Sequence, residues 1–414
     1  MTRTQSEDNM TSGWKTVKLG ELGTIVGGAT PSTRKHENYD NGTIAWITPK
    51  DLSNHNERFI SRGERNITET GLKGCSAQLM PKHSVLFSSR APIGYVAIAA
   101  NELCTNQGFK SIVPNSKTDY LFLYYLLRYN KNKIEHLGSG TTFKEVSGSV
   151  MRNIEVRVPP LDVQRRIAAV LKPLDDKIEL NARINARLER AAQALFKRHF
   201  VRFEPYGGTM PPGWRVGTLS EIAEYLNGLA MQKFRPKEGE VGVPVLKIKE
   251  LRQGVCDESS ELCSPSIKRE YLVHDGDVIF SWSGTLLVDF WCGGECGLNQ
   301  HLFKVTSSKY DKWFYYVWTK HHLRKFIAMA ADMATTMGHI KREALDNSEV
   351  LIPTQEDYAE IGSLMSPLFD MIIENRKQSR TLARLRDVLL PRLMSGAVDV
   401  RQVRLNTMQE GGSR

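Results

Sequence analysis

The chain has 414 residues, too many for one ordinary hydrophobic core, and this length predicts two or three domains. Lysine and arginine number 56 against 46 acidic residues, so the net charge of +10 is compatible with a polyanionic partner. The sequence contains no run of about 18 apolar residues, and its polar start lacks the apolar core of a signal peptide. These features argue against a membrane protein, and we expect a soluble protein of the cytoplasm.

Two similar segments of the chain begin 200 residues apart (213 − 13). The first reads Gly-Trp-Lys-Thr-Val-Lys-Leu-Gly-Glu-Leu from Gly13, and the second reads Gly-Trp-Arg-Val-Gly-Thr-Leu-Ser-Glu-Ile from Gly213. Each pattern predicts a short strand followed by a short helix that begins near Gly20 or Ser220.

The similarity continues along the chain at a nearly constant offset. The matching segments are Ser84–Ser88 with Asp277–Ser281 and Asn106-Gln107 with Asn299-Gln300 at 193 (277 − 84, 299 − 106), and Thr141-Thr142 with Thr335-Thr336 and Pro159 with Pro353 at 194 (335 − 141, 353 − 159). Such a constant offset indicates a tandem duplication. Each repeat is predicted to be a globular domain followed by one long helix.

Inside each repeat, short runs with strand-like alternation are separated by turns that contain glycine or proline. The clearest runs are Ser84–Ser88, Tyr95–Ala99, Val278–Trp282 and Leu286–Trp291. An aromatic stretch at helical spacing follows in each repeat, at Tyr120–Leu127 and Trp313–Val317. We expect these aromatic residues to lie in the core rather than to stack on bases, because helical spacing is typical of a buried helix face. The predicted fold class is mixed α/β (α+β).

Each repeat ends in a stretch whose apolar residues recur in alternating steps of four and three, from Leu161 to Phe200 and from Thr354 to Met394. The residues of this seam are Ile167, Leu171, Leu174, Ile178, Leu188 and Leu195 in the first stretch, and Ile361, Met365, Leu368, Ile372, Leu382 and Leu389 in the second. A narrow apolar seam requires a partner helix nearly parallel to its axis. We therefore predict two long helices that pair as an antiparallel coiled coil.

Polar residues interrupt this seam. Asn181 and Asn375 occupy equivalent steps, where a buried amide favours one alignment of the helices. The alternative is that the helix pair frays there and the amides are hydrated. Arg386 also occupies a seam step, and its guanidinium must either extend to solvent or meet an acidic residue.

The chain has six cysteines: Cys75, Cys104, Cys256, Cys263, Cys292 and Cys296. In the cytoplasm these thiols are expected to be reduced. No Cys-x-x-Cys pair and no histidine at zinc-ligand spacing accompanies them, so buried structural thiols are favoured over a metal site.

Several motifs, ordered alike in both repeats, make the chain similar to a known family, the DNA specificity subunits of type I restriction-modification systems. These motifs are the two Gly-Trp openings, Ser88–Gly94, Asp275–Val278, Gly138–Phe143 and the approach from Pro160 to Gln164 at the first long helix. The second helix departs from the pattern, because Pro353 is followed by Thr354-Gln355. The resemblance covers the chain from Trp14 to about Asp399.

The resemblance implies a DNA-binding subunit without catalytic chemistry of its own. In that family, each of two target recognition domains binds one half of a bipartite site on double-stranded DNA. The paired helices set the gap between the halves and hold two modification subunits that methylate adenine, and restriction subunits complete the complex. This chain is then expected to need no cofactor, whereas S-adenosylmethionine, ATP and Mg²⁺ belong to the partner subunits.

The resemblance and the repeats together divide the chain into seven parts. They are a polar leader (1–13), target recognition domain 1 (14–160), spacer helix 1 (161–202), a linker (203–213), target recognition domain 2 (214–353), spacer helix 2 (354–396) and a tail (397–414). Residues 406–414 of the tail are expected to be disordered.

Candidate DNA contacts are chosen by chemistry, because Arg, Lys, Asn and Gln read base edges while Lys, Arg, Ser and Thr hold phosphates. In the first repeat they are Lys50, Ser89, Arg90, Asn106, Gln107, Thr141, Thr142 and Lys144. In the second they are Lys247, Lys249, Trp282, Ser283, Asn299, Gln300, His301, Thr335, Thr336, His339 and Lys341. The alternative for the Asn-Gln pairs is a turn that bonds its own backbone, and for the Thr-Thr pairs a helix cap. Treated as equivalent positions, Arg90 and Trp282 predict half-sites of different sequence.

Four basic residues lie on the second long helix: Arg376, Lys377, Arg380 and Arg384. They either face the DNA of the gap or form a solvated face, which is the usual place of charged helix residues. Ile184 and Leu385 lie outside the strict seam, and we expect the modification subunits to cover them.

Two other functions are compatible with the sequence. The chain could itself be a methyltransferase with divergent motifs, although an Asn-Pro-Pro-aromatic tetrad, a phosphate-binding Gly-x-x-x-x-Gly-Lys-Ser/Thr loop and a convincing acidic nuclease triplet are all missing from the sequence. It could also be a non-catalytic scaffold that binds DNA without sequence preference and releases it steeply with salt.

Overall fold

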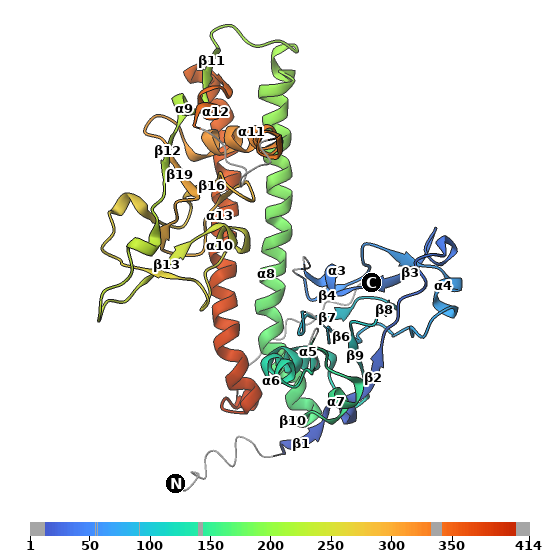
Figure 1. Cartoon of the computed structure of the whole chain (residues 1–414). Helices are drawn as coiled ribbons and strands as arrows, with labels where there is room; N and C mark the ends of the chain where they lie inside the picture. Colours follow the sequence, from blue (N-terminus) through green and yellow to red (C-terminus); the bar gives the residue numbers. More distant parts are fainter. Residues whose placement is uncertain are drawn as a thin grey trace. The chain divides into compact units, whose positions relative to one another are not determined.

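The structure is a computed structural model that describes residues 13–53, 55, 57–90, 92–139, 144–332 and 342–402. The chain forms two compact units: unit 1 comprises Met1–Glu179 and Leu382–Arg414, and unit 2 comprises Leu180–Thr381. Each unit holds one globular domain together with parts of both long helices (Figure 1). Within the described ranges, no helix is long and apolar enough to cross a membrane.

The domain of unit 1 is built from three small sheets. Its strands are β1 (Lys15–Lys18), β2 (Gly23–Gly27), β3 (Ile44–Ile47), β4 (Phe59–Ile60), β5 (Asn66–Ile67), β6 (Val85–Phe87), β7 (Val96–Ala99), β8 (Cys104–Thr105), β9 (Lys110–Pro114) and β10 (Glu155–Val158). Its helices are α2 (Leu19–Leu22), α3 (Pro49–Ser53), α4 (Glu69–Lys73), α5 (Tyr120–Tyr129), α6 (Lys131–His136) and α7 (Gly148–Asn153). The sheets have the strand orders β2-β9-β6-β7-β4, β5-β3-β8 and β1-β10.

The domain of unit 2 repeats this plan. Its strands are β11 (Arg215–Thr218), β12 (Glu224–Asn227), β13 (Val243–Leu246), β14 (Leu262–Cys263), β15 (Leu272–Val273), β16 (Val278–Ser281), β17 (Leu287–Phe290), β18 (Cys296–Leu298), β19 (Leu302–Thr306) and β20 (Glu349–Ile352). Its helices are α9 (Leu219–Ile222), α10 (Ile248–Gln253), α11 (Lys312–Asp332) and α12 (Glu343–Asp346). The sheets have the orders β12-β19-β16-β17, β14-β13-β18-β15 and β11-β20.

Both domains open and close in the same way, which agrees with the duplication. Strand β1 pairs antiparallel with β10 and strand β11 with β20, so the first strand of each domain is held by its last. The short helices begin at Leu19 and Leu219, one residue before the predicted starts. In both cases the leucine N–H donates to a carbonyl just before the last strand, at 2.9 Å to Ile154 and 3.0 Å to Ser348. The predicted mixed α/β class is confirmed.

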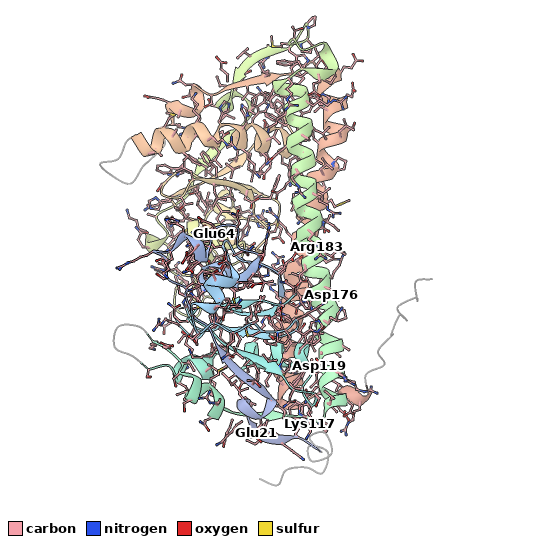
Figure 2. The ribbon with its side chains drawn as sticks, turned by 90° about the vertical axis from the view of Figure 1, so that its right-hand side faces the viewer. Glu21, Glu64, Lys117, Asp119, Asp176 and Arg183 are labelled. Carbon is pink, nitrogen blue, oxygen red and sulfur yellow. The ribbon has the colours of Figure 1, made fainter. Side chains whose placement is uncertain are left out.

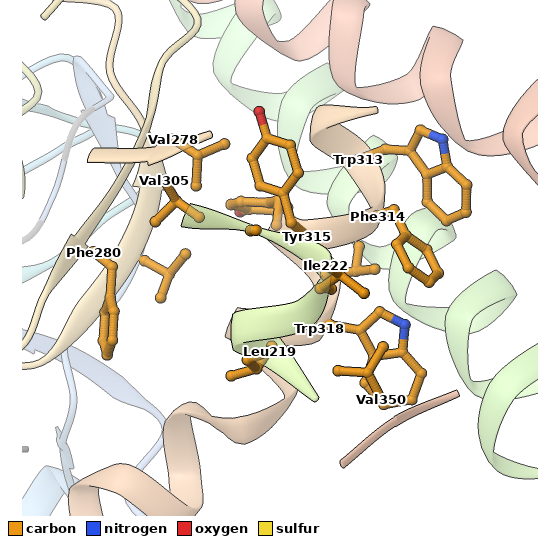
Figure 3. Close-up of a cluster of buried hydrophobic side chains, with 14 of the residues drawn as sticks. Leu219, Ile222, Val278, Phe280, Val305, Trp313, Phe314, Tyr315, Trp318 and Val350 are labelled. Carbon is orange, nitrogen blue, oxygen red and sulfur yellow. The ribbon is translucent and has the colours of Figure 1, made fainter. Parts of the chain in front are cut away.

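The aromatic stretches lie in the cores, as predicted. All residues of α5 from Leu121 to Leu127 are buried. In unit 2, Phe314 and Trp318 project from α11 toward α9 and the neighbouring strands (Figure 3), while Trp313 packs against Tyr358 of α13 (Gln355–Ser395). The apolar faces of these helices thus close one side of each sheet.

The long helices are α8 (Leu161–Phe196), extended by a π-helical turn at Lys197–Val201, and α13 (Gln355–Ser395). In unit 1 the start of α8 shares one apolar cluster with the end of α13, through Ile167, Leu171 and Leu390. In unit 2 the end of α8 shares a cluster with the start of α13. Start meets end in both units, so the predicted antiparallel pairing is confirmed.

The seam between the long helices is only partly buried. Ile167, Leu171, Ile361, Met365 and Ile372 are buried. The remaining seam residues are half-buried: Leu174, Ile178, Leu188, Leu195, Leu368, Leu382 and Leu389. Outside the seam, Leu385 is exposed and Ile184 is half-buried.

The asparagines of the seam form a network between the two helices in unit 2. The Asn181 amide donates to the backbone oxygen of Asn375 at 3.2 Å and to Gln378 Oε1 at 2.9 Å. Asn375 donates to Asn185 Oδ1 at 2.9 Å, and Asn185 donates to the Ile372 carbonyl at 3.3 Å. Asn181 is fully buried, so the alternative of hydrated, frayed amides is wrong. Any shift of one helix along the other would break these bonds, which fixes their alignment.

In unit 1 the domain is anchored to acidic residues of α8. Arg58 is 4% exposed, and its Nε donates to Glu179 Oε1 at 2.8 Å while a guanidinium nitrogen binds Asp176. Asp176 is labelled on α8 in Figure 2. Asp175 accepts a hydrogen bond from Tyr125 at 2.6 Å and an ion pair from Arg386 at 2.7 Å. Of the two alternatives for Arg386, the structure therefore shows contact with an acidic residue.

In unit 2 the domain is anchored to basic residues of α13. For Arg376 and Arg380 this makes both predicted alternatives wrong, contact with the DNA of the gap and a solvated face. Arg376 binds Asp289 at 2.8 Å and Glu189 at 3.1 Å, and Arg380 forms a bidentate pair with Asp275 at 2.6 and 2.7 Å. Neither guanidinium forms a solvated face or is free to meet DNA, because the domain occupies both. Lys377 pairs within its own helix with Glu374, and Arg384 is exposed.

The two long helices begin differently, as their sequences predicted. Buried Gln164 donates to the carbonyls of Pro159 at 3.0 Å and Lys117 at 3.3 Å, and accepts from Asp119 N at 3.0 Å. Helix α13 uses a threonine cap instead: Asp357 N donates to Thr354 Oγ1 at 3.2 Å. The start of α8 is therefore bonded to the preceding domain through Gln164, whereas the start of α13 has a local cap.

Candidate nucleic-acid interface

In unit 1 the predicted contact residues Ser89, Asn106 and Gln107 lie on segments that backbone hydrogen bonds bring together. The turn after β2 reaches the one after β8, where Ala29 N donates to the Thr105 carbonyl at 3.0 Å. The segment after β6 joins them, because Ser89 N donates to the Gly108 carbonyl at 2.8 Å. The Thr30 hydroxyl also donates to the exposed side chain of Gln107. These bonds bring together residues that the sequence places on separate loops.

A glycine makes this convergence possible in each repeat. A Cβ atom on Gly28 would lie 2.0 Å from the Asn106 carbonyl oxygen, and one on Gly228 would lie 2.2 Å from that of Asn299. Only glycine permits such a close approach of two backbones. The same constraint in both repeats shows that the two clusters of turns are built alike.

The asparagines in these turns bond their own backbone. Asn106 Oδ1 accepts from Gly108 N at 2.9 Å, and Asn299 Oδ1 accepts from His301 N at 3.2 Å. In this geometry the asparagine side chain closes a turn, which was the alternative to DNA contact for the two Asn-Gln pairs. The structure thus gives Asn106 and Asn299 a positioning part in the turns, while Gln107 and Gln300 are free of that bond.

The cations in the unit 1 cluster are held by carboxylates. Arg90 donates to Glu145 at 2.8 Å, and Lys110 lies 3.4 Å from the same side chain. Lys50 binds Glu64 at 2.8 Å on the surface, and this contact raises the pKa of Lys50. Lys144 is exposed. Phosphates of DNA would compete with these carboxylates for the same cations.

Unit 2 has a different cluster, centred on His301. The Ser283 hydroxyl lies 3.2 Å from His301 Nδ1, and Gln300 Nε2 lies 3.3 Å from His301 Nε2. Trp282 stacks on Phe303 at 5.6 Å and donates its indole N–H to Asn227 at 3.0 Å. The side chains here are an imidazole, an amide and aromatic rings, whereas in unit 1 a guanidinium is held by a carboxylate.

The two predicted lysines of unit 2 lie at either side of the start of α10. Lys247 binds Glu261, and this contact lowers the pKa of Glu261. Lys249 donates to Ser259 Oγ at 2.7 Å and lies 3.8 Å from Asp257. As in unit 1, each cation is paired with a carboxylate that phosphates could replace.

The equivalence of Arg90 and Trp282 is wrong. Ser88 lies opposite Phe109 and Ser281 lies opposite Leu302, and both pairs differ by 193 (281 − 88, 302 − 109). Trp282 therefore corresponds to Ser89, and Ser283 to Arg90. Ser89 and Ser283 are also buried, so neither hydroxyl reaches the surface in this structure.

Some predicted residues cannot be placed, and two others were missed. Thr141, Thr142, Thr335, Thr336, His339 and Lys341 lie outside the described residues. Thr30 and Asn227 belong to the clusters but were not predicted. The signal that could have found them is their position, because each lies at most two residues from the glycine that follows its strand, Gly28 or Gly228.

The cysteines form no metal cluster in the part of the chain that the structure describes. All six are free thiols; Cys104, Cys263, Cys292 and Cys296 are buried, and Cys75 and Cys256 are half-buried. Burial raises the pKa of Cys104 to about 12 and that of Cys292 to about 11, which makes these two thiols unreactive at neutral pH.

Comparison with known proteins gives a consistent result. Residues 11–190 and 211–382 each match the type I restriction modification DNA specificity domain. The MjaIX specificity subunit of a type I restriction enzyme from Methanocaldococcus jannaschii is 36% identical over 94% of both chains. The EcoKI specificity subunit from Escherichia coli is 24% identical over 92% of this chain and 88% of its own. The crystal structure of an S subunit from M. genitalium shares the fold, with a TM-score of 0.57 over 92% of this chain and 96% of the other, at 16% identity.

Two similar domains, each joined to parts of one antiparallel helix pair and each matching a DNA specificity domain, define a duplicated DNA-recognition protein. The chain belongs to the specificity subunits of type I restriction-modification systems. Such subunits recognise DNA and are not catalytic, and they act in a complex with modification and restriction subunits.

Proposed function

We propose that each globular domain reads one half of a bipartite, asymmetric DNA site, and that the paired helices set the gap between the halves. The observation that carries this proposal is the duplication, because the specificity domain occurs twice and each copy is joined to the same helix pair. The domain limits of 14–160 and 214–353 and the spacer helices of 161–202 and 354–396 are part of the proposal.

The two clusters of turns support half-sites of different sequence. Arg90 is a side chain that suits a bidentate contact with guanine, whereas His301 and Gln300 offer an imidazole and an amide. Among the remaining candidates, we propose that the lysines bind phosphates. The threonines outside the described residues either bind phosphates or cap helices. Asn106 and Asn299 position the turns that carry their neighbours.

The asparagine network supports a fixed gap. Hydrogen bonds from Asn181, Asn185 and Asn375 hold α8 and α13 at one alignment in unit 2. A helix pair that cannot slide is suited to hold a constant spacing between two DNA-binding domains.

The partners follow from the same proposal. Two modification subunits bind along the helices and methylate adenine with S-adenosylmethionine, and restriction subunits add chemistry that needs ATP and Mg²⁺. Exposed Leu385 on α13 supports an apolar contact with such a subunit. The assembled complex acts on DNA in the cytoplasm.

Methylation mapping tests the proposal. The chain is co-expressed with its modification subunit, and methylated adenines are mapped across the host genome. A bipartite motif with two unlike halves and a constant gap is expected. Methylation at a single undivided motif, or no methylation by a complex that purifies intact, would reject the proposal.

A helix insertion tests the gap directly. Four extra residues, about one turn, lengthen a helix by roughly 6 Å, which corresponds to about two base pairs of DNA. Inserted into the middle of α8, they are expected to change the preferred gap and leave both half-sites unchanged. The control places four residues in the linker 203–213, where no change of gap is expected. An unchanged gap in the helix variant would show that the helices do not set it.

A further inference from the structure

Two cysteines of unit 2 are in direct contact and have no part in the proposed function. The Sγ atoms of Cys256 and Cys296 lie 3.4 Å apart. Cys256 is half-buried in the loop that follows α10, and Cys296 is fully buried at the start of β18. The two residues are 40 positions apart (296 − 256), so the tertiary fold creates the contact.

We propose that Cys256 and Cys296 are an oxidation site, at which a small disulfide oxidant of the glutathione class converts the two thiols to one intramolecular disulfide. The bond would tie the loop 254–260 to strand β18. The contact needs to shorten from 3.4 Å to about 2.0 Å, a movement that a surface loop on one side can provide.

The two cysteines have distinct parts in the reaction. Cys256 is the accessible thiol, so its thiolate attacks one sulfur of the oxidant and releases the first thiol of the oxidant. Cys296 then attacks Cys256 Sγ, the mixed disulfide breaks, and the second thiol leaves. The chain loses two electrons to the oxidant, and the two cysteine protons end on the released thiols. The contact with Cys296 lowers the pKa of Cys256, whereas the contact with Cys256, together with burial, raises the pKa of Cys296.

The bond would connect two segments of the candidate nucleic-acid interface. The loop 254–260 already contacts α10, since Ser260 Oγ donates to Glu250 at 3.2 Å and Ser259 accepts from Lys249. Strand β18 ends at Leu298 and leads directly into the Asn299-Gln300 turn. A disulfide would therefore restrain both Lys249 and that turn. The effect on DNA reading rests on the proposed function, whereas the disulfide itself does not.

The other thiols provide controls within the same chain. Cys75 and Cys104 share one apolar cluster in unit 1, but their thiols donate to the carbonyls of Leu72 at 3.7 Å and Ala45 at 3.6 Å. Cys263 likewise donates to the Val243 carbonyl at 3.4 Å. Among the bonds of these described thiols, only that of Cys256 and Cys296 joins sulfur to sulfur.

Peptide mapping of the full chain tests the oxidation site. The reduced chain is incubated with oxidised glutathione under native conditions, and is then denatured, alkylated and digested. The expected product is a disulfide between the peptides of Cys256 and Cys296 that dithiothreitol reverses, with Cys75 and Cys104 alkylated. The proposal fails if Cys256 and Cys296 are both alkylated as free thiols, or if Cys256 stops at a mixed disulfide with glutathione.

Variants separate the site from its effect. Cys256→Ala and Cys296→Ala should each abolish the cross-link, and Cys263→Ala should retain it; because Cys256 is only half-buried, its variant is the one expected to fold normally. In the complex with modification subunits, oxidation is expected to weaken binding to the second half-site at least threefold and to leave the first unchanged, with no effect in Cys256→Ala. A cross-link without this loss would refute the coupling to DNA, and a reduced complex without sequence preference would refute the proposed function alone.

Discussion

In unit 1 the domain supplies the cation that binds the helix, whereas in unit 2 the helix supplies the cations that bind the domain. Arg58 of the first domain reaches Glu179 and Asp176 on α8. Arg376 and Arg380 of α13 reach Asp289 and Asp275 in the second domain. The two copies of the domain are thus attached to the long helices by ion pairs in which the positions of the cation and the carboxylate are exchanged.

The corresponding positions show that duplication preserved the fold but not these attachments. At an offset of 194, Arg376 and Arg380 correspond to Ala182 and Ala186 (376 − 194, 380 − 194), and Glu179 corresponds to Ile373 (179 + 194). Each domain therefore fits the charges of its own helix segment. A domain moved to the other position would leave charges without partners, and unpaired buried charges are costly.

The largest effect on stability is expected from removing the Arg58 anchor of unit 1. Arg58→Ala leaves Glu179 buried without its cation, which should cost roughly 3–5 kcal/mol of the free energy of unfolding. Denaturant titration measures the loss, and hydrogen exchange of β6 and β7 assigns it to unit 1. Lys50→Ala is the matched control, because it removes an exposed pair with Glu64 and should leave the midpoint unchanged. Equal destabilisation by both variants would contradict the importance given to Arg58.

A smaller effect is expected from the anchor of unit 2. Arg380→Ala removes a bidentate pair that is partly exposed, and about 1.5–3 kcal/mol should be lost. The loss should appear in the exchange of β16 and β17 and not in β6 and β7. Arg384→Ala, one turn further along the same helix and exposed, is the control. If β6 and β7 lose protection as well, the two units do not unfold separately.

Two substitutions test the proposed DNA contacts of the two clusters. Arg90→Ala should reduce affinity for one half-site about tenfold, the typical effect of losing a bidentate base contact. His301→Ala should weaken the other half-site. Binding to DNA with each half altered in turn measures both. If Arg90→Ala weakens both halves equally, Arg90 does not read bases.

The smallest effect is a dependence on pH. Partial burial acts to raise the pKa of Asp275, but the bonds from Arg380 and the Gly294 N–H outweigh it and hold that pKa below its ordinary value. A lowered pKa in the folded state contributes stability above the unfolded pKa of about 3.9, and this stability is lost as pH falls through the folded value. Unit 2 should therefore become less stable below about pH 4, and Asp275→Asn should flatten that decline in unit 2 only. In the same variant, the stability of unit 1 should still fall at low pH, because Asp176 is unchanged there. Partial burial acts to raise the pKa of Asp176, but Lys172 and Arg58 lower it.

The features that local spacing encodes could be predicted from the sequence. The strands at Val85–Phe87 and Val278–Ser281, the buried face of α5 and the seam of the long helices all follow from periods of two or of three to four residues. The repeat also made it possible to predict that the two long helices pair with each other. These patterns depend on neighbours within two or three turns, which one sequence displays directly.

The anchors could not be predicted, because their partners are far apart in the chain. Arg58 and Glu179 are 121 positions apart, and Arg380 and Asp275 are 105 apart. Nothing in the spacing of Arg376 and Arg380 distinguishes a buried pair from a solvated face. The alignment of Arg90 with Trp282 failed for a related reason, since a loop was matched without the register of the strand beside it.

Unit 1 completes its core with residues from distant parts of the chain: Leu390, Leu393 and Met394 lie in the same apolar cluster as Leu19. On the ribosome, the 202 residues of unit 2 (381 − 180 + 1) are synthesised in between. At roughly 5–20 residues per second, the first domain waits about 10–40 s with part of its apolar surface uncovered. A premature stop codon that removes the last thirty residues would therefore damage the domain that is made first and spare the one that is made last.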